Sequence, residues 1–545
     1  MVNKAVMMAG EAGTAAAPAE VAQAASTAGG LALLSAANAP IELVFGLVGP
    51  TGVDLRAVAT VLESQLKAVK YEARQISLSD LILGNSGQNA ENLNEYERID
   101  LLIKEGNDLC RQTKAGDIVG RLGLSAIRQH RESISGDKNV PHSSARVAYI
   151  VKSFKRPEEV ELYRNTYGKA FTLISVYASR ASRIHALSKR FQSCISSIDK
   201  DDPRGARTPE ELAIRVIDRD YKEEEEEFGQ RVGKTFPLAD FFLSNGPRLE
   251  IERQLTRLVR LTLGDPYISP TRDEQGMFFA YAAALRSLDL SRQVGAAVVT
   301  QDGEILSTGC NEVPKFEGGL YWAEDPGCQR DFELGYDANV KIKTEIVEDA
   351  VRTLREKGWL SDLVKAESDE KLAKGMLFGS DNFFADSKLF DVIEFGRAVH
   401  AEMDAISQAA RMGVPLQNSR LFCTTFPCHI CARHILAAGI RDVIFIEPYE
   451  KSRTSDLYSD SISIEPHEPA LKKANFKAFV GVAPRRYIDM FQMASKRKKK
   501  DGSIIDLNIE ELKPKFKRFV FTYIAAELLF ERELETLLGS IKEKS

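Results

Sequence analysis

Two short stretches decide the fold of the second half of the chain: His400-Ala401-Glu402 and Pro427-Cys428-His429-Ile430-Cys431. Cys428 follows His400 by 28 positions. One imidazole and two thiolates supply three of the four ligands of tetrahedral zinc and leave the fourth position open for water, whereas a structural zinc site is normally closed by a fourth protein ligand. Cys428 and Cys431 stand at the expected start of a helix, whose N-terminus favours thiolates. The spacing therefore predicts a catalytic Zn2+ site with His400, Cys428 and Cys431 as ligands.

Glu402 lies two residues beyond the predicted histidine ligand. At that distance its carboxylate can reach a water on the metal without binding the metal itself. Zinc lowers the pKa of its water toward ~7, and a neighbouring carboxylate can take that proton and pass it on. Glu402 is therefore predicted to be the catalytic acid and base.

The combination H-x-E plus P-C-x-x-C is the signature of zinc deaminases that act on cytosine or adenine. On these residues the chain resembles the cytidine/deoxycytidylate deaminase superfamily. The resemblance implies a three-layer α/β/α domain and hydrolytic attack at C4 of the cytosine ring, with release of ammonia. A structural zinc ribbon would need a second C-x-x-C, and a redox C-x-x-C would leave His400 and Glu402 unexplained.

The segment before the metal motif indicates which class of substrate the site would take. Ser291–Ala296 followed by Thr308–Pro314 resembles the deoxycytidylate deaminases, and the resemblance implies that Asn311 binds the sugar of a nucleotide. A turn residue with positive φ is the alternative for Asn311. Beyond the last expected strand, Lys451 and Ser452 are candidate phosphate contacts, because a triphosphate needs charge-assisted donors; solvated loop residues are the alternative.

The N-terminal part of the chain has a different sequence pattern. Leu43–Val48 is a short apolar run typical of a buried strand, and a helical pattern follows the turn Gly49, Pro50, Thr51 and Gly52. Further apolar runs at Val147–Val151 and Ala170–Tyr177 predict βαβ units and a parallel sheet. The turn resembles a Walker A loop in part, but the phosphate-binding Lys and the magnesium-binding hydroxyl are missing. We therefore expect a P-loop kinase-like domain with a degenerate nucleotide-binding loop, which is a poor phosphotransferase and serves as a nucleotide sensor, a partner-binding module or a scaffold.

The two parts together resemble the bacterial anti-phage dCTP deaminases. The resemblance implies conversion of dCTP, and also of dCMP, to the uracil nucleotide, which would deplete the dCTP pool during phage infection. It further implies a homo-oligomer and a regulatory nucleotide or inhibitory partner at the front domain. A tRNA or single-stranded DNA deaminase is the alternative enzyme, weakly favoured by the basic run Lys496–Lys500, and a nucleotide-sensing scaffold or toxin is the alternative outside enzymes.

Length and composition agree with a soluble, multidomain α/β protein. The 545 residues carry 73 basic and 78 acidic side chains, a net charge of −5, which argues against a dedicated duplex-binding protein. Seven cysteines are too few and odd in number for a secreted disulfide framework, so a cytoplasmic location without membrane attachment is expected. The predicted parts are a disordered Ala/Gly-rich tail at 1–40, the P-loop kinase-like domain at 41–253, the deaminase domain at 254–460 with a long insertion at about 314–390, and a C-terminal helical extension at 461–545.

Overall fold

The computed structural model describes residues 42–87, 93–136, 146–194, 208–222, 228–361, 364, 367–379, 392–448, 452–465, 472–515 and 520–542. The predicted tail at 1–40 and the candidate phosphate contact Lys451 lie outside these residues. No helix in the described part of the chain combines the length and apolar character needed to span a bilayer.

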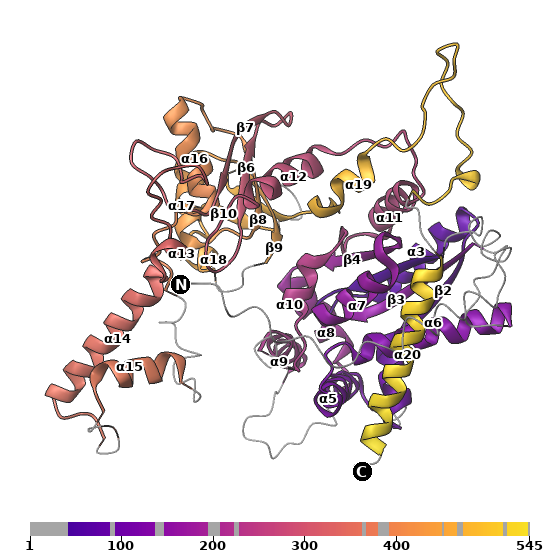
Figure 1. Ribbon diagram of the computed structural model, residues 1–545, viewed down its shortest axis with the longest axis horizontal. Coiled ribbons are helices and arrows are strands. Elements are labelled where there is room, and N and C mark those ends of the chain that lie inside the picture. The colour runs from indigo at the N-terminus through magenta and orange to yellow at the C-terminus, as the bar shows by residue number, and fades with distance from the viewer. Residues whose placement is uncertain are drawn as a thin grey trace, which may run out of the picture. The chain divides into compact units, whose positions relative to one another are not determined.

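The chain forms two compact units. Unit 1 comprises residues 1–268 and 489–545, and unit 2 comprises residues 269–488 (Figure 1). These limits differ from the predicted ones at 253 and 460. Helix α11 (Arg248–Thr262) packs against α3 (Leu55–Ala68) within unit 1, while two strands after residue 460 extend the sheet of unit 2.

Unit 1 is built on a parallel sheet whose strands lie in the order β5-β4-β1-β3-β2. The inner strands β1, β3 and β4 are buried on both faces, which explains their nearly continuous apolar sequences. Their bounds are β1 Leu43–Val48, β2 Glu72–Ser77, β3 Val147–Phe154, β4 Phe171–Tyr177 and β5 Phe241–Ser244. Besides α3 and α11, the helices before the chain enters unit 2 are α4 (Leu78–Ser86), α5 (Glu95–Thr113), α6 (Ile118–Ser135), α7 (Pro157–Tyr167), α8 (Arg180–Arg190), α9 (Pro209–Lys222) and α10 (Val232–Thr235).

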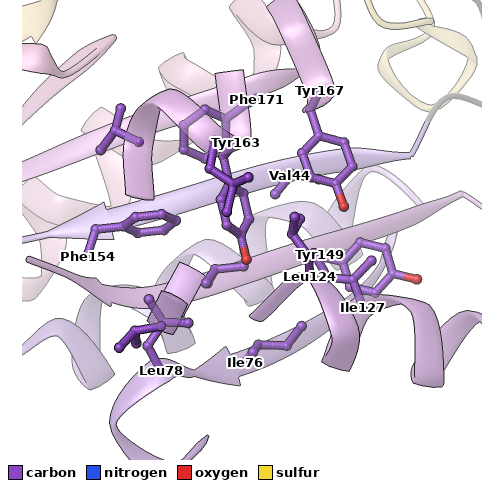
Figure 2. Close-up of a cluster of buried hydrophobic side chains, with 14 of the residues drawn as sticks. Val44, Ile76, Leu78, Leu124, Ile127, Tyr149, Phe154, Tyr163, Tyr167 and Phe171 are labelled. Carbon is purple, nitrogen blue, oxygen red and sulfur yellow. The ribbon is translucent and has the colours of Figure 1, made fainter. Parts of the chain in front are cut away.

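An aromatic cluster fills one side of this sheet. Figure 2 shows Phe154, Tyr163, Tyr167 and Phe171 among aliphatic side chains from the strands and helices. The rings of Phe154 and Tyr163 meet edge to face at 5.0 Å between centroids. Burial of each such ring contributes roughly 1.5–3 kcal/mol, so this cluster holds α7 firmly to the carboxyl-terminal part of the sheet.

The C-terminal helix α20 (Val520–Lys542) returns to unit 1, where it packs on α5, α6 and α7. Its buried Glu527 accepts hydrogen bonds from Arg131 at 2.7 Å and from the Tyr167 hydroxyl at 2.5 Å. Arg131 also binds Glu42, at the start of β1, at 2.7 Å. Glu42, Arg131 and Glu527 are each no more than 4% exposed. Two carboxylates thus share one guanidinium in the interior and connect the last helix to the first strand.

Removal of the Glu527 charge should destabilise unit 1, because the buried Arg131 and Arg128 would each lose one of their carboxylate partners. We expect Glu527→Gln to lower the unfolding free energy by about 3–5 kcal/mol, measured by denaturant unfolding followed through the tyrosine signal. The exposed Glu535→Gln change on the same helix is the control and should lie within about 0.5 kcal/mol of the parent. Equal midpoints for the two variants would contradict a stabilising role of the buried network.

Unit 2 contains a sheet with the strand order β10-β11-β9-β8-β6-β7. Strands β6 and β7 form the predicted antiparallel hairpin, and β8, β9, β11 and β10 pair in parallel. Their bounds are β6 Gly295–Val299, β7 Ile305–Cys310, β8 Arg420–Thr425, β9 Asp442–Glu447, β10 Ile462–Ile464 and β11 Ala474–Ala478. The short strand β12 (Gly481–Val482) follows β11 in the chain and is not part of this sheet. The unit is therefore mixed α/β, with a largely parallel sheet.

Helices cover both faces of this sheet. Gly295 in β6 faces α12 (Arg272–Ala284), whereas the next residue, Ala296, packs with Ala401 and Ala405 of α16 (Ala401–Met412) on the other face. The remaining described helices of this unit are α13 (Asp331–Leu334), α14 (Ala338–Glu356), α15 (Asp369–Phe378), α17 (His429–Ala437) and α18 (Thr454–Leu457). Helix α19 (Tyr487–Phe491) spans the limit at residue 488. Helices α14 and α15, from the long insertion, pack against each other around a small apolar core of their own (Figure 1).

Candidate active site

The three predicted metal ligands lie at the starts of two helices. His400 is the N-cap residue of α16, and Cys428 is the N-cap residue of α17, which follows β8 through a short loop with Pro427. Cys431 lies one turn into α17, and its backbone N–H donates to the Cys428 sulfur at 3.5 Å. Each N-terminus places positive peptide dipoles beside a side chain that binds metal as an anion or a neutral imidazole.

The donor atoms converge on one point. The His400 Nδ1 atom lies 3.3 Å from the Cys428 Sγ atom and 3.3 Å from the Cys431 Sγ atom. All three donor atoms lie within 4.8 Å of one another. A tetrahedral zinc ion with ordinary Zn–S and Zn–N bonds would separate such a nitrogen and sulfur by about 3.6 Å. The residues therefore fit zinc with only small side-chain adjustments.

The two cysteines differ in the pKa of their thiols. A hydrogen bond from Cys431, followed by the interaction with His400, lowers the pKa of Cys428 to about 4 despite its burial. The same contact and burial raise the pKa of the Cys431 thiol well above its ordinary value. The thiolate is the form that binds metal, so the lowered pKa of Cys428 favours metal binding, and binding at Cys431 would release its proton.

Glu402 points at this group from the first turn of α16. The side chain is 4% exposed, and its Oε2 atom accepts a hydrogen bond from the Cys431 Sγ atom at 3.4 Å. Burial, followed by the nearby Cys428 charge, raises the pKa of Glu402 above its ordinary value. A raised pKa suits a carboxyl that must both take up and give back a proton near neutral pH.

A glycine sets the position of α16. A Cβ atom at Gly309 in β7 would stand 2.3 Å from the Ala401 backbone oxygen and 2.4 Å from the Ala405 backbone nitrogen. Asp404 strengthens the same contact, because its carboxylate accepts the Cys310 N–H at 3.2 Å. The helix that carries His400 and Glu402 therefore lies directly on the strand backbone, at a distance that only glycine permits.

The predicted substrate contacts have structural partners of their own. The Asn311 side chain accepts the Val294 N–H at 2.7 Å and donates to the Arg292 carbonyl at 2.8 Å, so both ends of its amide hold the segment before β6. Its φ is not positive, which removes the turn alternative. Ser452 donates to the Pro427 carbonyl at 3.0 Å, next to the first cysteine ligand. Contact of either side chain with a nucleotide stays a prediction.

Two polar pairs beside the site have no local sequence signal. Arg292 pairs with Glu447 at 3.2 Å, and His429, between the two cysteines, lies 3.3 Å from Glu394 of the insertion. Glu447 ends the strand that neighbours β8 and aligns with Thr425, three residues before Cys428. The sequence position of Glu447, at the end of the strand predicted after the cysteine motif, could have identified it as a residue near the metal site.

Comparison with known proteins assigns the class of this site. Residues 270–447 match the family profile described as the cytidine and deoxycytidylate deaminase zinc-binding region. Unit 2 thus contains a region similar to the zinc-binding region of the cytidine and deoxycytidylate deaminases, with a His-Cys-Cys group that could bind a metal.

Individual relatives cover only part of the chain. The deoxycytidylate deaminase of Enterobacteria phage T4 is 29% identical over 174 residues, which are 32% of this chain and 77% of the phage protein. ComE operon protein 2 of Bacillus subtilis (strain 168) is 41% identical over 54 residues, 10% of this chain, so the match spans only 29% of that protein. Among solved structures, the dCMP deaminase of cyanophage S-TIM5 in complex with dCMP and dUMP is 19% identical, with a TM-score of 0.21, and the match covers 39% of this chain and 99% of that one.

Loss of a thiolate should remove the metal. We expect Cys428→Ser to lower the zinc content of the purified protein from near one ion per chain to background, because a serine hydroxyl does not ionise at neutral pH. Elemental analysis by mass spectrometry measures the content, and Cys194→Ser, at a buried cysteine of unit 1, controls for general effects of the substitution. Full zinc retention in the first variant would remove Cys428 from the ligand set.

A methyl group at Gly309 should displace α16. We expect Gly309→Ala to lower the thermal midpoint and to reduce zinc content, since the added Cβ atom would overlap backbone atoms that cannot move independently of His400. Gly375→Ala is the matched control, because that glycine lies in α15 with no atom near its added Cβ. A Gly309 variant with parental stability and zinc content would show that α16 does not depend on this contact.

Proposed function

We propose that unit 2 deaminates deoxycytidine nucleotides, taking dCTP and also dCMP to the corresponding uracil nucleotide and ammonia. The observation that carries this proposal is the buried Glu402 carboxyl held against the His400, Cys428 and Cys431 donor group inside a region similar to the zinc-binding region of these deaminases. The T4 relative is itself a deoxycytidylate deaminase, which favours deoxycytidine nucleotides over free bases.

Glu402 provides the proton path of the proposed reaction. When bound, zinc would supply a water whose pKa is close to ~7. The Glu402 carboxylate would take a proton from the attacking water and deliver it to N3 of the cytosine ring. A second transfer through the same carboxylate protonates the departing amino group, so that the oxygen of water replaces nitrogen at C4 and ammonia leaves. Burial of Glu402 excludes bulk water, which would otherwise compete for its proton.

Unit 1 supports the proposal of a degenerate P-loop kinase-like domain. Its parallel sheet, with the turn Gly49–Gly52 between β1 and α3, is the kind of arrangement in which proteins hold nucleotide phosphates. However, the Thr51 N–H donates to Asp220 at 2.9 Å, and Asp54 caps α3 by accepting the Ala57 N–H at 3.0 Å. Carboxylates thus occupy donors that a phosphotransferase would direct at phosphate, which supports a regulatory role for the unit.

A role in phage defence follows from the resemblance to two-domain dCTP deaminases. Consumption of dCTP would deprive an infecting phage of a precursor for DNA synthesis. A controlling unit joined to the deaminase suits such an activity, because the host needs the same nucleotide when no phage is present.

The test is a substrate comparison with purified, zinc-loaded protein. We expect uracil products from dCTP and dCMP, and none from CTP or a single-stranded oligonucleotide, by liquid chromatography. Glu402→Gln should lower the rate by about 10²–10⁴-fold while zinc is retained, and the exposed Glu304→Gln should leave the rate unchanged.

Absence of any nucleotide product, or an unchanged rate in Glu402→Gln, would contradict the proposal. Conversion of the oligonucleotide alone would identify a polynucleotide deaminase instead. In phage-infected cells, only the active protein should lower both the dCTP pool and the phage yield.

A further inference from the structure

A basic pocket in unit 1 stands outside the deaminase site. It has a volume of about 160 Å³, and its lining includes the cations Arg98, Lys155, Arg156 and Arg190. The turn residues Thr51 and Gly52 form another part of the wall. Among the lining residues only Glu159 carries a negative charge, and its carboxylate accepts the backbone N–H groups of Lys155 and Arg156.

The pocket lies where the topology of the sheet changes direction. After β1 the chain moves toward the β2 edge, whereas after β3 it crosses to β4 on the opposite side of β1. Thr51 and Gly52 follow the end of β1, and Lys155 and Arg156 follow the end of β3. In open α/β sheets, ligands bind in the crevice outside the carboxyl ends of the strands at such a switch point.

Carboxylates lie beside the lining cations, but Lys155 has none within hydrogen-bond distance among its described partners. Glu95 pairs with both Arg98 and Arg190, so one carboxylate serves two guanidinium groups, and the Asp54 charge also acts on Arg190. The Lys155 ammonium nitrogen is 3.8 Å from the Asp220 carboxylate, which is beyond hydrogen-bond distance. The Nε atom of Arg156 is buried without a hydrogen-bond partner among the described residues.

Asp220 is a buried carboxylate that contacts two residues of the pocket wall, Thr51 and Lys155. It is 5% exposed, accepts the Thr51 N–H at 2.9 Å through Oδ2, and holds its Oδ1 atom 3.8 Å from the Lys155 ammonium nitrogen. The turn is also fixed in place, since Gly52 has φ of +100° and a Cβ there would come within 2.9 Å of Arg183 in α8. A ligand anion that enters the pocket must therefore compete with the Asp220 carboxylate for Lys155.

We propose that this pocket binds the phosphoryl group of a small molecule through the side chains of Lys155 and Arg190, and that Asp220 competes with that group. Ligand pockets for whole drug-sized molecules usually measure roughly 300–1,000 Å³, so the space suits a phosphoryl group with the remainder of the ligand outside. Phosphate is bound here by side-chain cations instead of loop amides, which distinguishes the site from a P-loop. The inference rests on the nucleotide-binding role proposed for unit 1 and is independent of deamination by unit 2.

The test is calorimetric titration of the full-length, zinc-loaded protein with pyrophosphate at constant ionic strength. We expect saturable binding that weakens by on the order of tenfold, ~1.4 kcal/mol, in Lys155→Gln and in Arg190→Gln. Lys67→Gln is the matched control, because Lys67 is an exposed lysine whose ion-pair partner among the described residues is its helix neighbour Glu63. Asp220→Asn should tighten binding by a similar factor, whereas Asp218→Asn, an exposed residue of the same helix, should not.

Absence of saturable binding, or equal losses in Lys155→Gln and Lys67→Gln, would overturn the site. Unchanged or weaker binding in Asp220→Asn would overturn the competition. Parallel titrations with inorganic phosphate and ATP identify the source of the phosphoryl group: Lys155-dependent binding of ATP assigns a nucleotide, and binding of the inorganic anions alone assigns a free anion. Deamination assays on the same preparations report on unit 2 separately, since none of these residues belongs to its site.

Discussion

The contact between β7 and α16 at Gly309 is the constraint on which the deaminase site depends. Because the strand has no side chain at this position, the first turn of α16 lies on its backbone, and that turn carries both His400 and Glu402. Strand β8 lies on the other side of β6 and delivers Cys428 and Cys431 through the start of α17. The metal donors therefore meet because two helix N-termini are fixed by one sheet, and not because they are close in sequence.

The sequence predicted the parts of the structure that are determined locally. Apolar runs identified β1, β3 and β4, and the deaminase motifs located the donor group and Glu402. Strand β2 was missed because it is a sheet edge whose sequence, Glu-Ala-Arg-Gln-Ile-Ser, buries only Ile76. The partners of Asn311 and the pairing of Arg292 with Glu447 were also missed, since they join segments whose proximity exists only after the sheet has formed.

The limits of the two units also depend on contacts between segments that are far apart in the sequence. Nothing in residues 520–542 indicates a partner, and an amphipathic helix after a basic segment was interpreted as an extension. The structure joins it to unit 1 through Arg131, which lies 396 positions before Glu527. A buried guanidinium that needs two carboxylates selects this packing strongly, because an unpaired charge in the same interior would cost several kcal/mol. Such long-range charge pairing has no local sequence signal.

The connectivity that results bears on how one unit could control the other. Unit 2 is inserted in the sequence of unit 1, between α11 and the segment that leads to α20. Both of its ends therefore continue into unit 1. A ligand that alters unit 1 can influence unit 2 only by binding two of its states with different affinity. The proposed pocket would offer such a difference, since a bound phosphoryl group would repel the Asp220 carboxylate of α9 across the Lys155 ammonium group. Regulation would then arise from exchange of one carboxylate for another anion, without any phosphotransfer chemistry in unit 1.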